Sequence, residues 1–171
     1  MQRRQIAATT LGWVLWTGTE YAMHRGAFHF RPTRSRSTLG GRARQALIRL
    51  VAAEHRSHHR EPLRTSLFLR LLGHVAVAAV SSGVPVMVRH RDAWAGWVGF
   101  TVGYSVYETV HWRIHHCPGT VNDARVEHHR VHHEEATRSN FGVTVPWWDH
   151  AFGTVAVARR RPDLSPGVLV D

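Results

Sequence analysis

The sequence predicts an all-α protein, in which membrane-embedded helices place a histidine-rich metal site on the cytosolic side. Three observations support this fold class: long stretches almost without charge, arginine-rich segments between them, and histidines that recur at helical spacing. An apolar stretch of about 20 residues is long enough to cross a bilayer as a helix. The length of 171 residues suits one domain.

The first apolar stretch covers residues 5–23 and contains Glu20 as its only ionisable residue. A signal peptide would end in a small-residue cleavage site, but this stretch continues into "EYAMHRGAFHF". We therefore predict a membrane helix. The following segment, 31–64, is rich in arginine and interrupted by Pro32 and Gly40-Gly41, which predicts a basic loop and then a polar helix.

Two further apolar stretches, 71–88 and 93–110, are separated only by "RHRD". Two helices joined by so short a turn form an antiparallel hairpin, which places residues near 60 and 111 on one side of a membrane. Arginine density in 25–64 and 113–138 indicates that this side is cytoplasmic. The interfacial preference of tryptophan supports an integral membrane protein, with Trp13, Trp16, Trp94 and Trp97 near the ends of the stretches. The alternative is that the stretches are buried core helices of a soluble protein.

The chain has a formal net charge of +10, and all 22 of its basic residues are arginine. Such an excess fits either nucleic acid or an anionic membrane surface. The arginines lie in segments between apolar stretches, without a recognisable nucleic-acid-binding fold, so we expect no nucleic-acid partner. Cys117 is the only cysteine and can form neither an internal disulfide nor a zinc knuckle.

Twelve of the 15 histidines fall into four clusters: His24 and His29; His55, His58 and His59; His111, His115 and His116; and His128, His129, His132 and His133. Side chains three or four residues apart share a helix face, so 55 with 58 and 59, 111 with 115, and 129 with 132 and 133 are predicted chelating pairs or triples. The 24–29 spacing is one residue longer and fits a helix end that loosens after Gly26. One cluster alone fits a solvated basic face, but four clusters indicate metal. Ten or more imidazoles exceed the three or four that one zinc takes, which predicts two ions.

Acidic residues accompany these clusters. Glu20 precedes His24 by four residues and Glu108 precedes His111 by three. A ligating imidazole usually donates its other N–H to a carboxylate or carbonyl, so both carboxylates are candidates to orient ligands. Simple solvation at the membrane interface is the alternative role. The sequence contains no HExxH, CxxC or CxxCH pattern, which argues against a zincin protease, a zinc ribbon and covalent haem.

Five segments together resemble the fatty acid hydroxylase superfamily of membrane di-metal oxygenases, which includes sterol desaturases and carotenoid hydroxylases. They are "LWTGTEYAMHRGAFH", "EHRSHH", "YETVHWRIHH", "HHRVHH" and "NFGVTVPWWDHAFGT". The first and last are most similar to the fatty acid 2-hydroxylase branch. The resemblance implies an all-α protein, in which membrane-embedded helices carry a cytosolic helical cap that holds a histidine-rich di-metal site. It implies a hydroxylase-like membrane domain over 1–157 and leaves 158–171 as a basic C-terminal tail.

The resemblance also implies the metal ligands, carried over position by position: His24, His29, His55, His58, His59, His111, His115, His129, His132 and His133. No catalytic residue separate from these ligands is expected. His116 and His128 are extra members of their clusters, expected to support the ligands or to substitute for them. Asp149, in a segment similar to the one that closes over the site in the family, is expected to hydrogen-bond a ligand imidazole; the alternative for this segment is a packed aromatic turn.

The implied activity is dioxygen-dependent hydroxylation of a lipid C–H bond. A fatty acyl chain is the expected substrate. Two irons are expected for activity, and zinc fits the same ligands in a purified sample, because imidazole suits both metals. Electrons are expected from a separate ferredoxin or cytochrome-type donor with its reductase. The alternatives are a carotenoid or sterol hydroxylase or desaturase of the same superfamily, and a membrane metal-binding protein without catalysis.

Overall fold

The computed structural model describes residues 2–29, 39–64 and 66–158, and every regular element in these ranges is a helix. The elements are α1 (Gln2–Met23), the π-helix η1 (His24–Phe28), α2 (Leu39–Arg60), α3 (Leu67–Ser81), α4 (Gly83–Val88), α5 (Arg91–His116), the 3₁₀-helix η2 (Pro118–Thr120), α6 (Asp123–Glu134) and α7 (Trp147–Ala151). The all-α prediction is therefore confirmed. Residues 31–38 of the predicted loop, and all of the predicted tail except Ala158, lie outside the described residues. Gly40 and Gly41, which we predicted to interrupt the chain, instead belong to the first turn of α2, so that prediction is wrong.

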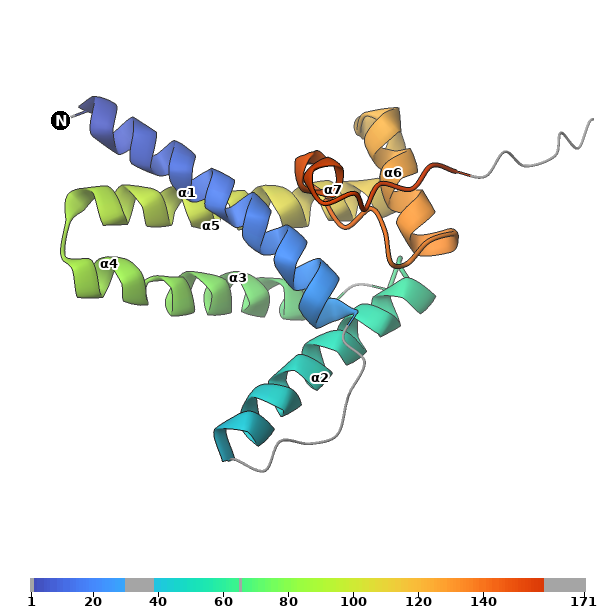
Figure 1. Ribbon diagram of the computed structural model, residues 1–171, viewed down its shortest axis with the longest axis horizontal. Helices are drawn as coiled ribbons and strands as arrows, with labels where there is room; N and C mark the ends of the chain where they lie inside the picture. The colour runs from blue at the N-terminus through green and yellow to red at the C-terminus, as the bar shows by residue number, and fades with distance from the viewer. Residues whose placement is uncertain (1, 30–38, 65, 159–171) are drawn as a thin grey trace, which may run out of the picture.

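Helices α1 and α5 cross with their backbones in direct contact (Figure 1). A Cβ atom added to Gly12 would lie 1.9 Å from the carbonyl oxygen of Gly96, and one added to Gly99 would lie 1.9 Å from that of Thr9. Glycine is required at both positions, since any side chain would force the helices apart. Small residues at a crossing are typical of helices that pack in membranes, where close van der Waals contact replaces the hydrophobic effect.

The core of the molecule forms around Trp16, which is only 3% exposed. Its ring makes edge-to-face contacts with Phe100 and Tyr104 of α5, at centroid distances of 5.2 and 5.0 Å. The prediction that Trp16 lies at a membrane interface is therefore wrong. The indole fits into the core because Gly103, directly beneath it, has no side chain.

The predicted hairpin is present, with α3 and α4 antiparallel to α5 (Figure 1). Arg89 ends α4 in the left-handed region, with φ of 52°, and His90 caps α5 by accepting a hydrogen bond from the Asp92 N–H at 3.2 Å. Helix α5 extends well beyond the predicted stretch 93–110. It carries His111 and His115 on the same rigid rod as the apolar residues.

The three predicted apolar stretches all form helices, but within the described residues only Leu67–Val88 is long and apolar enough to cross a membrane by length and composition. Stretches 5–23 and 93–110 are less apolar than predicted, because the glycines and hydroxyl-bearing residues that allow α1 and α5 to touch lower their hydropathy. Both helices still expose apolar side chains, among them Leu11 and Leu15 on α1 and Val98 and Val102 on α5.

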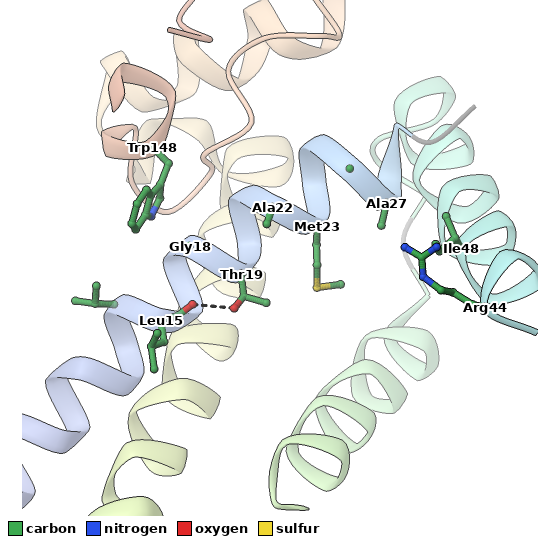
Figure 2. Close-up of a pocket in the computed structure, with 11 residues that line it drawn as sticks. Leu15, Gly18, Thr19, Ala22, Met23, Ala27, Arg44, Ile48 and Trp148 are labelled. Atoms are coloured by element: carbon green, nitrogen blue, oxygen red, sulfur yellow. Dashed lines mark hydrogen bonds between the residues drawn. The ribbon is translucent and has the colours of Figure 1, made fainter. Parts of the chain in front are cut away.

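A largely apolar groove of about 770 Å³ lies between α1 and the first half of α2 (Figure 2). Leu15 and Met23 of α1 line it on one side and Ile48 of α2 on the other. Trp148 closes one end, and the Arg44 side chain points into it from α2. Helix α2 therefore does not close against α1 along this length.

The glycine contacts predict the effect of one added methyl group. Gly99→Ala should lower the free energy of unfolding by about 1–3 kcal/mol, because the methyl group must displace the α1 backbone. The unfolding midpoint in detergent should fall accordingly. Gly83→Ala is the matched control, since no atom lies within 4 Å of its added Cβ. Equal midpoints for the two variants would contradict the close crossing.

Candidate metal centre

Ten histidines converge where the C-terminal ends of α2 and α5 meet η1 and α6 (Figure 1). They form two groups of five, and within each group the candidate ligand atoms all lie within 4.8 Å of one another. Group A consists of His24, His29, His55, His59 and His132; group B consists of His58, His111, His115, His129 and His133. These are the ten residues that the sequence analysis proposed as ligands.

The partition between the groups follows the helical register. His55 and His59, four residues apart on α2, enter group A, while His58 between them enters group B. The predicted chelating pairs are therefore kept, whereas a single group does not hold all three histidines of either predicted triple. Residues i and i+4 differ by about 40° around a helix, whereas i and i+3 differ by about 60° in the opposite sense. The third histidine therefore points to the neighbouring group.

Helix α6 repeats this pattern with the groups exchanged. His129 and His133, four residues apart, enter group B, and His132 enters group A. Each group thus receives two closely spaced pairs and one imidazole from a helix that mainly serves the other group. The rings of His59 and His133 stack across the boundary, with centroids 4.1 Å apart and an interplanar angle of 15°.

The spacing of His24 and His29 is explained by a π-helix. The chain changes from α-helix to π-helix at His24, so the looser geometry begins at this ligand candidate and not after Gly26 as predicted. A π-helix bonds residues five apart, and it therefore brings side chains at i and i+5 together. The two rings stack at 5.3 Å and both enter group A.

The Nε2 atoms of group A show a distinct geometry. Those of His24, His29 and His59 each lie 2.9–3.2 Å from the Nε2 atoms of both His55 and His132. The five Nε2 atoms therefore form a trigonal bipyramid. The atoms of His55 and His132 are its two poles, and those of His24, His29 and His59 form its equator. A metal about 2.1 Å from each nitrogen would separate polar from equatorial atoms by about 3.0 Å. The observed separations fit an ion at the centre.

Hydrogen bonds to backbone carbonyls fix the tautomers of two group A members. The Nδ1–H of His24 donates to the Phe141 carbonyl and that of His132 donates to the Ser139 carbonyl, each at 2.7 Å. The Nε2 atoms of the two neutral rings therefore both carry lone pairs, yet they lie 3.0 Å apart. Two facing lone pairs repel each other unless a cation lies between them, so this pair of residues fits a metal site.

Group B also fits a metal site, because some of its buried ring nitrogens have no hydrogen-bond partner. The Nε2 atoms of His58 and His133 are buried and have no hydrogen-bond partner. Buried polar atoms nearly always have a partner, so such atoms require an explanation. His115 links the remaining members, with its Nε2 atom 3.3 Å from that of His111 and 3.0 Å from that of His129.

Burial keeps these imidazoles neutral. It lowers the pKa of His58 to about 3, that of His59 to about 4, and that of His132 to about 3, because a buried imidazolium loses its hydration. Neighbouring imidazoles lower the pKa further by charge repulsion. At neutral pH the rings therefore offer lone pairs to an ion without first releasing a proton.

Glu20 does not bind a histidine, contrary to one predicted role. Its carboxylate is 4% exposed and accepts hydrogen bonds from the backbone N–H groups of Val143 and Thr144, at 2.7 and 2.8 Å, and from the Thr144 hydroxyl. The α1 face that carries Glu20 points to the loop after α6. The change to a π-helix at His24 turns that residue away from this face and toward group A. The carboxylate therefore fixes the loop whose Phe141 carbonyl holds His24.

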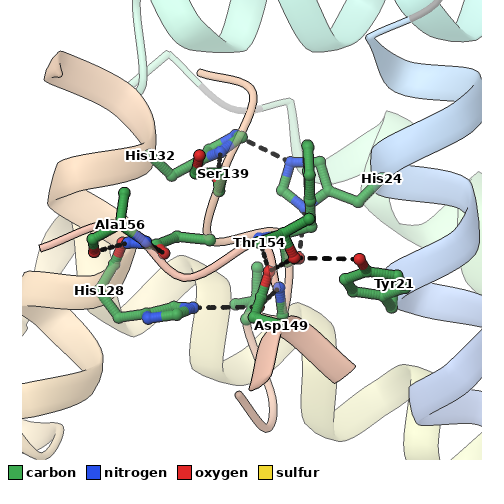
Figure 3. A network of polar contacts seen from close by, with 12 residues as sticks. Tyr21, His24, His128, His132, Ser139, Asp149, Thr154 and Ala156 are labelled. Carbon is green, nitrogen blue, oxygen red and sulfur yellow. Dashed lines mark hydrogen bonds and ion pairs between the residues drawn. The ribbon is translucent and has the colours of Figure 1, made fainter. Parts of the chain in front are cut away.

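Asp149 fixes the same loop from the other side (Figure 3). Its fully buried carboxylate accepts hydrogen bonds from the Phe141 and Gly142 N–H groups, at 2.9 and 2.7 Å, from the Thr154 hydroxyl at 2.7 Å, and from His128 Nε2 at 3.1 Å. These bonds keep the pKa of Asp149 below its usual range although burial opposes ionisation. The prediction that Asp149 bonds a ligand imidazole is wrong for the ten grouped histidines, because the imidazole it bonds belongs to His128.

Glu108 and His116 also lie outside both groups. Glu108 accepts a hydrogen bond from Arg70 Nε at 3.1 Å and from the Tyr104 hydroxyl at 3.5 Å, so it joins α3 to α5 and orients no histidine. Glu108, three residues before His111, therefore lies on the face of α5 that packs on α3. The His116 ring nitrogens contact the carbonyl oxygens of Trp112 and Leu63, which connects the end of α5 to the segment after α2.

Sequence reasoning missed Asn140, which is fully buried with φ of 56°. Its amide group donates to the carbonyls of His128 and Ala156 and accepts from the Ala156 N–H, at 2.7–3.0 Å, which attaches the end of the described chain to α6. The Asn-Phe-Gly sequence is a signal for this role, since asparagine tolerates the left-handed region better than most residues. Gly142 nearby has no room for a Cβ, which would lie 2.2 Å from the Val145 carbonyl oxygen.

A helical scaffold that gathers ten neutral imidazoles into two groups defines a protein with a histidine-rich centre able to hold metal ions. The particular family follows from the sequence match. The chain belongs to the fatty acid hydroxylase family, whose model matches residues 9–154.

Several proteins in this family are similar over most of the chain. Fatty acid 2-hydroxylase of Rattus norvegicus is 27% identical over 166 residues, which cover 94% of this chain and 42% of the relative. A dihydroceramide fatty acyl 2-hydroxylase of Arabidopsis thaliana is 26% identical over 161 residues, which cover 90% of this chain and 62% of the relative. The chain thus spans about two fifths of the rat protein's length.

The fold has a counterpart among solved structures. Full-length scs7p, of which only the hydroxylase domain is visible, superposes with a TM-score of 0.70 at 25% identity. The match covers 91% of this chain and 58% of that chain. The arrangement of helices described above is therefore shared with a hydroxylase domain.

The pKa values predict how the metal-free protein responds to acid. Buried histidines have folded pKa values below the unfolded value of about 6.5, so the unfolded chain binds more protons below that pH. The histidine contribution to stability is then complete above pH about 6.5 and falls with decreasing pH, by up to about 1.4 kcal/mol per pH unit for each histidine. Unfolding midpoints of the metal-free protein at several pH values would show it. His150→Ala, which removes an exposed histidine, should leave the slope unchanged. A midpoint independent of pH would contradict the prediction.

The hydrogen bonds of Asp149 predict a second effect. Asp149→Asn keeps the shape but places an NH₂ group against donors, so we expect a loss of about 2–4 kcal/mol and faster exchange of the Phe141 and Gly142 amide protons. Thermal unfolding and hydrogen exchange would measure both. Asp123→Asn removes an exposed carboxylate and is the control. Unchanged exchange at these two amides would show that the carboxylate does not hold the loop.

Proposed function

We propose that this chain is the hydroxylase part of an integral membrane non-haem di-iron oxygenase, which hydroxylates a lipid C–H bond, that of a fatty acyl chain, with dioxygen and external electrons. One observation carries the proposal: the lone pairs of His24 and His132 face each other at 3.0 Å inside a group of five imidazoles, an arrangement that a bound cation would stabilise. The relatives named as fatty acid and fatty acyl 2-hydroxylases support this substrate class.

The ten grouped histidines would hold two ions, one in each group. When bound, two irons supply the activation of dioxygen and the oxidising power that an unactivated C–H bond requires. Imidazole ligands accept both iron and zinc, so we expect that zinc can occupy the same positions in a purified sample.

The protein's own residues bind, orient and exclude water. The carbonyls of Phe141 and Ser139 hold the rings of His24 and His132 in one tautomer, and Glu20 and Asp149 hold the loop that carries these carbonyls. Burial of His24, His129 and His132 excludes water from the space between the rings. A dry site protects a strong oxidant from side reactions, which is the protein's part in such chemistry.

The proposal also covers the location of the protein, its electron donor and its substrate. The exposed apolar helices and the span Leu67–Val88 support residence in a membrane, from which a lipid substrate would enter. The arginine-rich segments support a metal centre on the cytoplasmic side. Electrons would come from a ferredoxin or cytochrome-type donor and its reductase. A carotenoid or sterol substrate has less support, because the similar proteins above are named for acyl chains.

His132→Ala tests the proposal directly. His132 is at one pole of group A, so its loss should lower the metal content and reduce hydroxylated lipid by more than the about 10–100-fold typical of residues that only support ligands. Lipid profiling of cells that express each protein, with metal analysis of the purified samples, would measure both. His150→Ala is the control, since that side chain is exposed and outside both groups. Iron-loaded protein that forms no oxygenated lipid with a reductant system would refute the proposed activity.

A further inference from the structure

Helix α2 presents three distinct faces. His55, His58 and His59 point to the metal centre. A second row, here called the arginine stripe, consists of Arg42, Arg49, Arg56 and Arg60. Each of the first three is about two helical turns from the next. Leu47 and Leu50 occupy the third face. At 100° per residue, the three faces are separated by about a third of a turn each.

Among the residues that the structure describes, only the first of these faces has a protein partner. Within the described residues, α2 packs chiefly on η1, at its histidine end, and its first half leaves the other helices (Figure 1). Leu47 and Leu50 are 62% and 68% exposed, and all four residues of the arginine stripe are exposed. A helix with so little tertiary packing is marginal in water and requires a partner for its apolar face.

Charge complementarity identifies that partner as a lipid surface. A basic stripe beside a narrow apolar stripe is typical of helices that lie in the headgroup region of an anionic membrane. Arg44 and the apolar groove between α1 and α2 extend the same kind of surface toward the helix α1 (Figure 2). Two leucines are too small a patch for a stable protein interface, which buries about 800 Å² on each partner.

We propose that α2 lies in the membrane interface, with Leu47 and Leu50 among the acyl chains and the arginine stripe on anionic headgroups. This inference rests on the proposed membrane residence but not on the proposed chemistry. The helix that carries three of the ten grouped histidines would then be held at a fixed depth, which places the centre beside the layer that supplies a lipid substrate.

Site-directed spin labels in nanodiscs test the orientation. Single cysteines at Leu47, Leu50, Arg49 and Arg56 are introduced into the full chain after Cys117→Ser, which replaces an exposed thiol. Labels at Leu47 and Leu50 should favour collisions with oxygen, which enters the bilayer, and labels at Arg49 and Arg56 should favour a water-soluble nickel chelate. A label at Val80, 83% exposed on α3, reports membrane residence separately.

The outcomes separate the two proposals. If the Val80 label is in the bilayer but all four α2 labels favour the chelate, the inference fails and membrane residence stands. If labels at Leu47 and Leu50 resist both reagents, the leucines are covered by protein, a second copy included, and the inference also fails. If the Val80 label favours the chelate, membrane residence itself is wrong.

A charge variant tests the headgroups. Adding phosphatidylglycerol to phosphatidylcholine nanodiscs should shift the Leu47 label deeper at low salt, and this shift should vanish when the arginine stripe is changed to glutamine. The control changes four other arginines to glutamine, Arg3 and Arg4 in the first turn of α1 and Arg89 and Arg91 at the turn of the hairpin, which removes the same charge from outside α2. A shift that survives in the stripe variant, or that is lost equally in the control, would overturn the role of the stripe.

Discussion

The structure depends on one constraint: ten neutral imidazoles, five of them buried and five partly buried, must face one another. Two rings that donate through Nδ1 to carbonyls can only present lone pairs at Nε2, and His24 and His132 do so at 3.0 Å. Such a contact is unfavourable unless a cation is present, so the fold has to hold the rings in place by other means. The glycine crossing of α1 and α5, the π-helix and the two buried carboxylates all do this.

The two groups are built as one unit. Because α2 and α6 each contribute to both groups, the position of either helix sets the geometry of two sites at once. The stacked rings of His59 and His133 form a shared wall between them. A rotation of α6 that opened group A would therefore also move His129 and His133, and the sites are mechanically coupled without any residue common to both.

The helical period indicated which histidines of α2, α5 and α6 share a helix face, because spacing along a helix is a local property, and the resemblance to the family supplied the full set of ten. Sequence reasoning could not assign His58 and His132 to their groups, because that choice depends on how each helix is rotated against its neighbours. Glu20 and Glu108 were close to histidines in the sequence, but their partners, Val143 and Arg70, are distant in the chain. Proximity along a helix gives the face of a residue, whereas its partner depends on what packs against that face.

The loop after α6 makes the two groups unequal. Its carbonyls hold His24 and His132 of group A, and both clamps, Glu20 and Asp149, act on this loop. In group B the Nδ1 atom of His129 is buried without a hydrogen-bond partner. A ring held only through one nitrogen can adjust its angle more easily than one held through two. His24 and His132 are thus held more firmly than His129. Group A is also the group attached to α1, through η1, while group B adds two histidines from α5. Since α1 and α5 touch backbone to backbone, the difference in rigidity arises from the loop and not from the helices that carry the ligands.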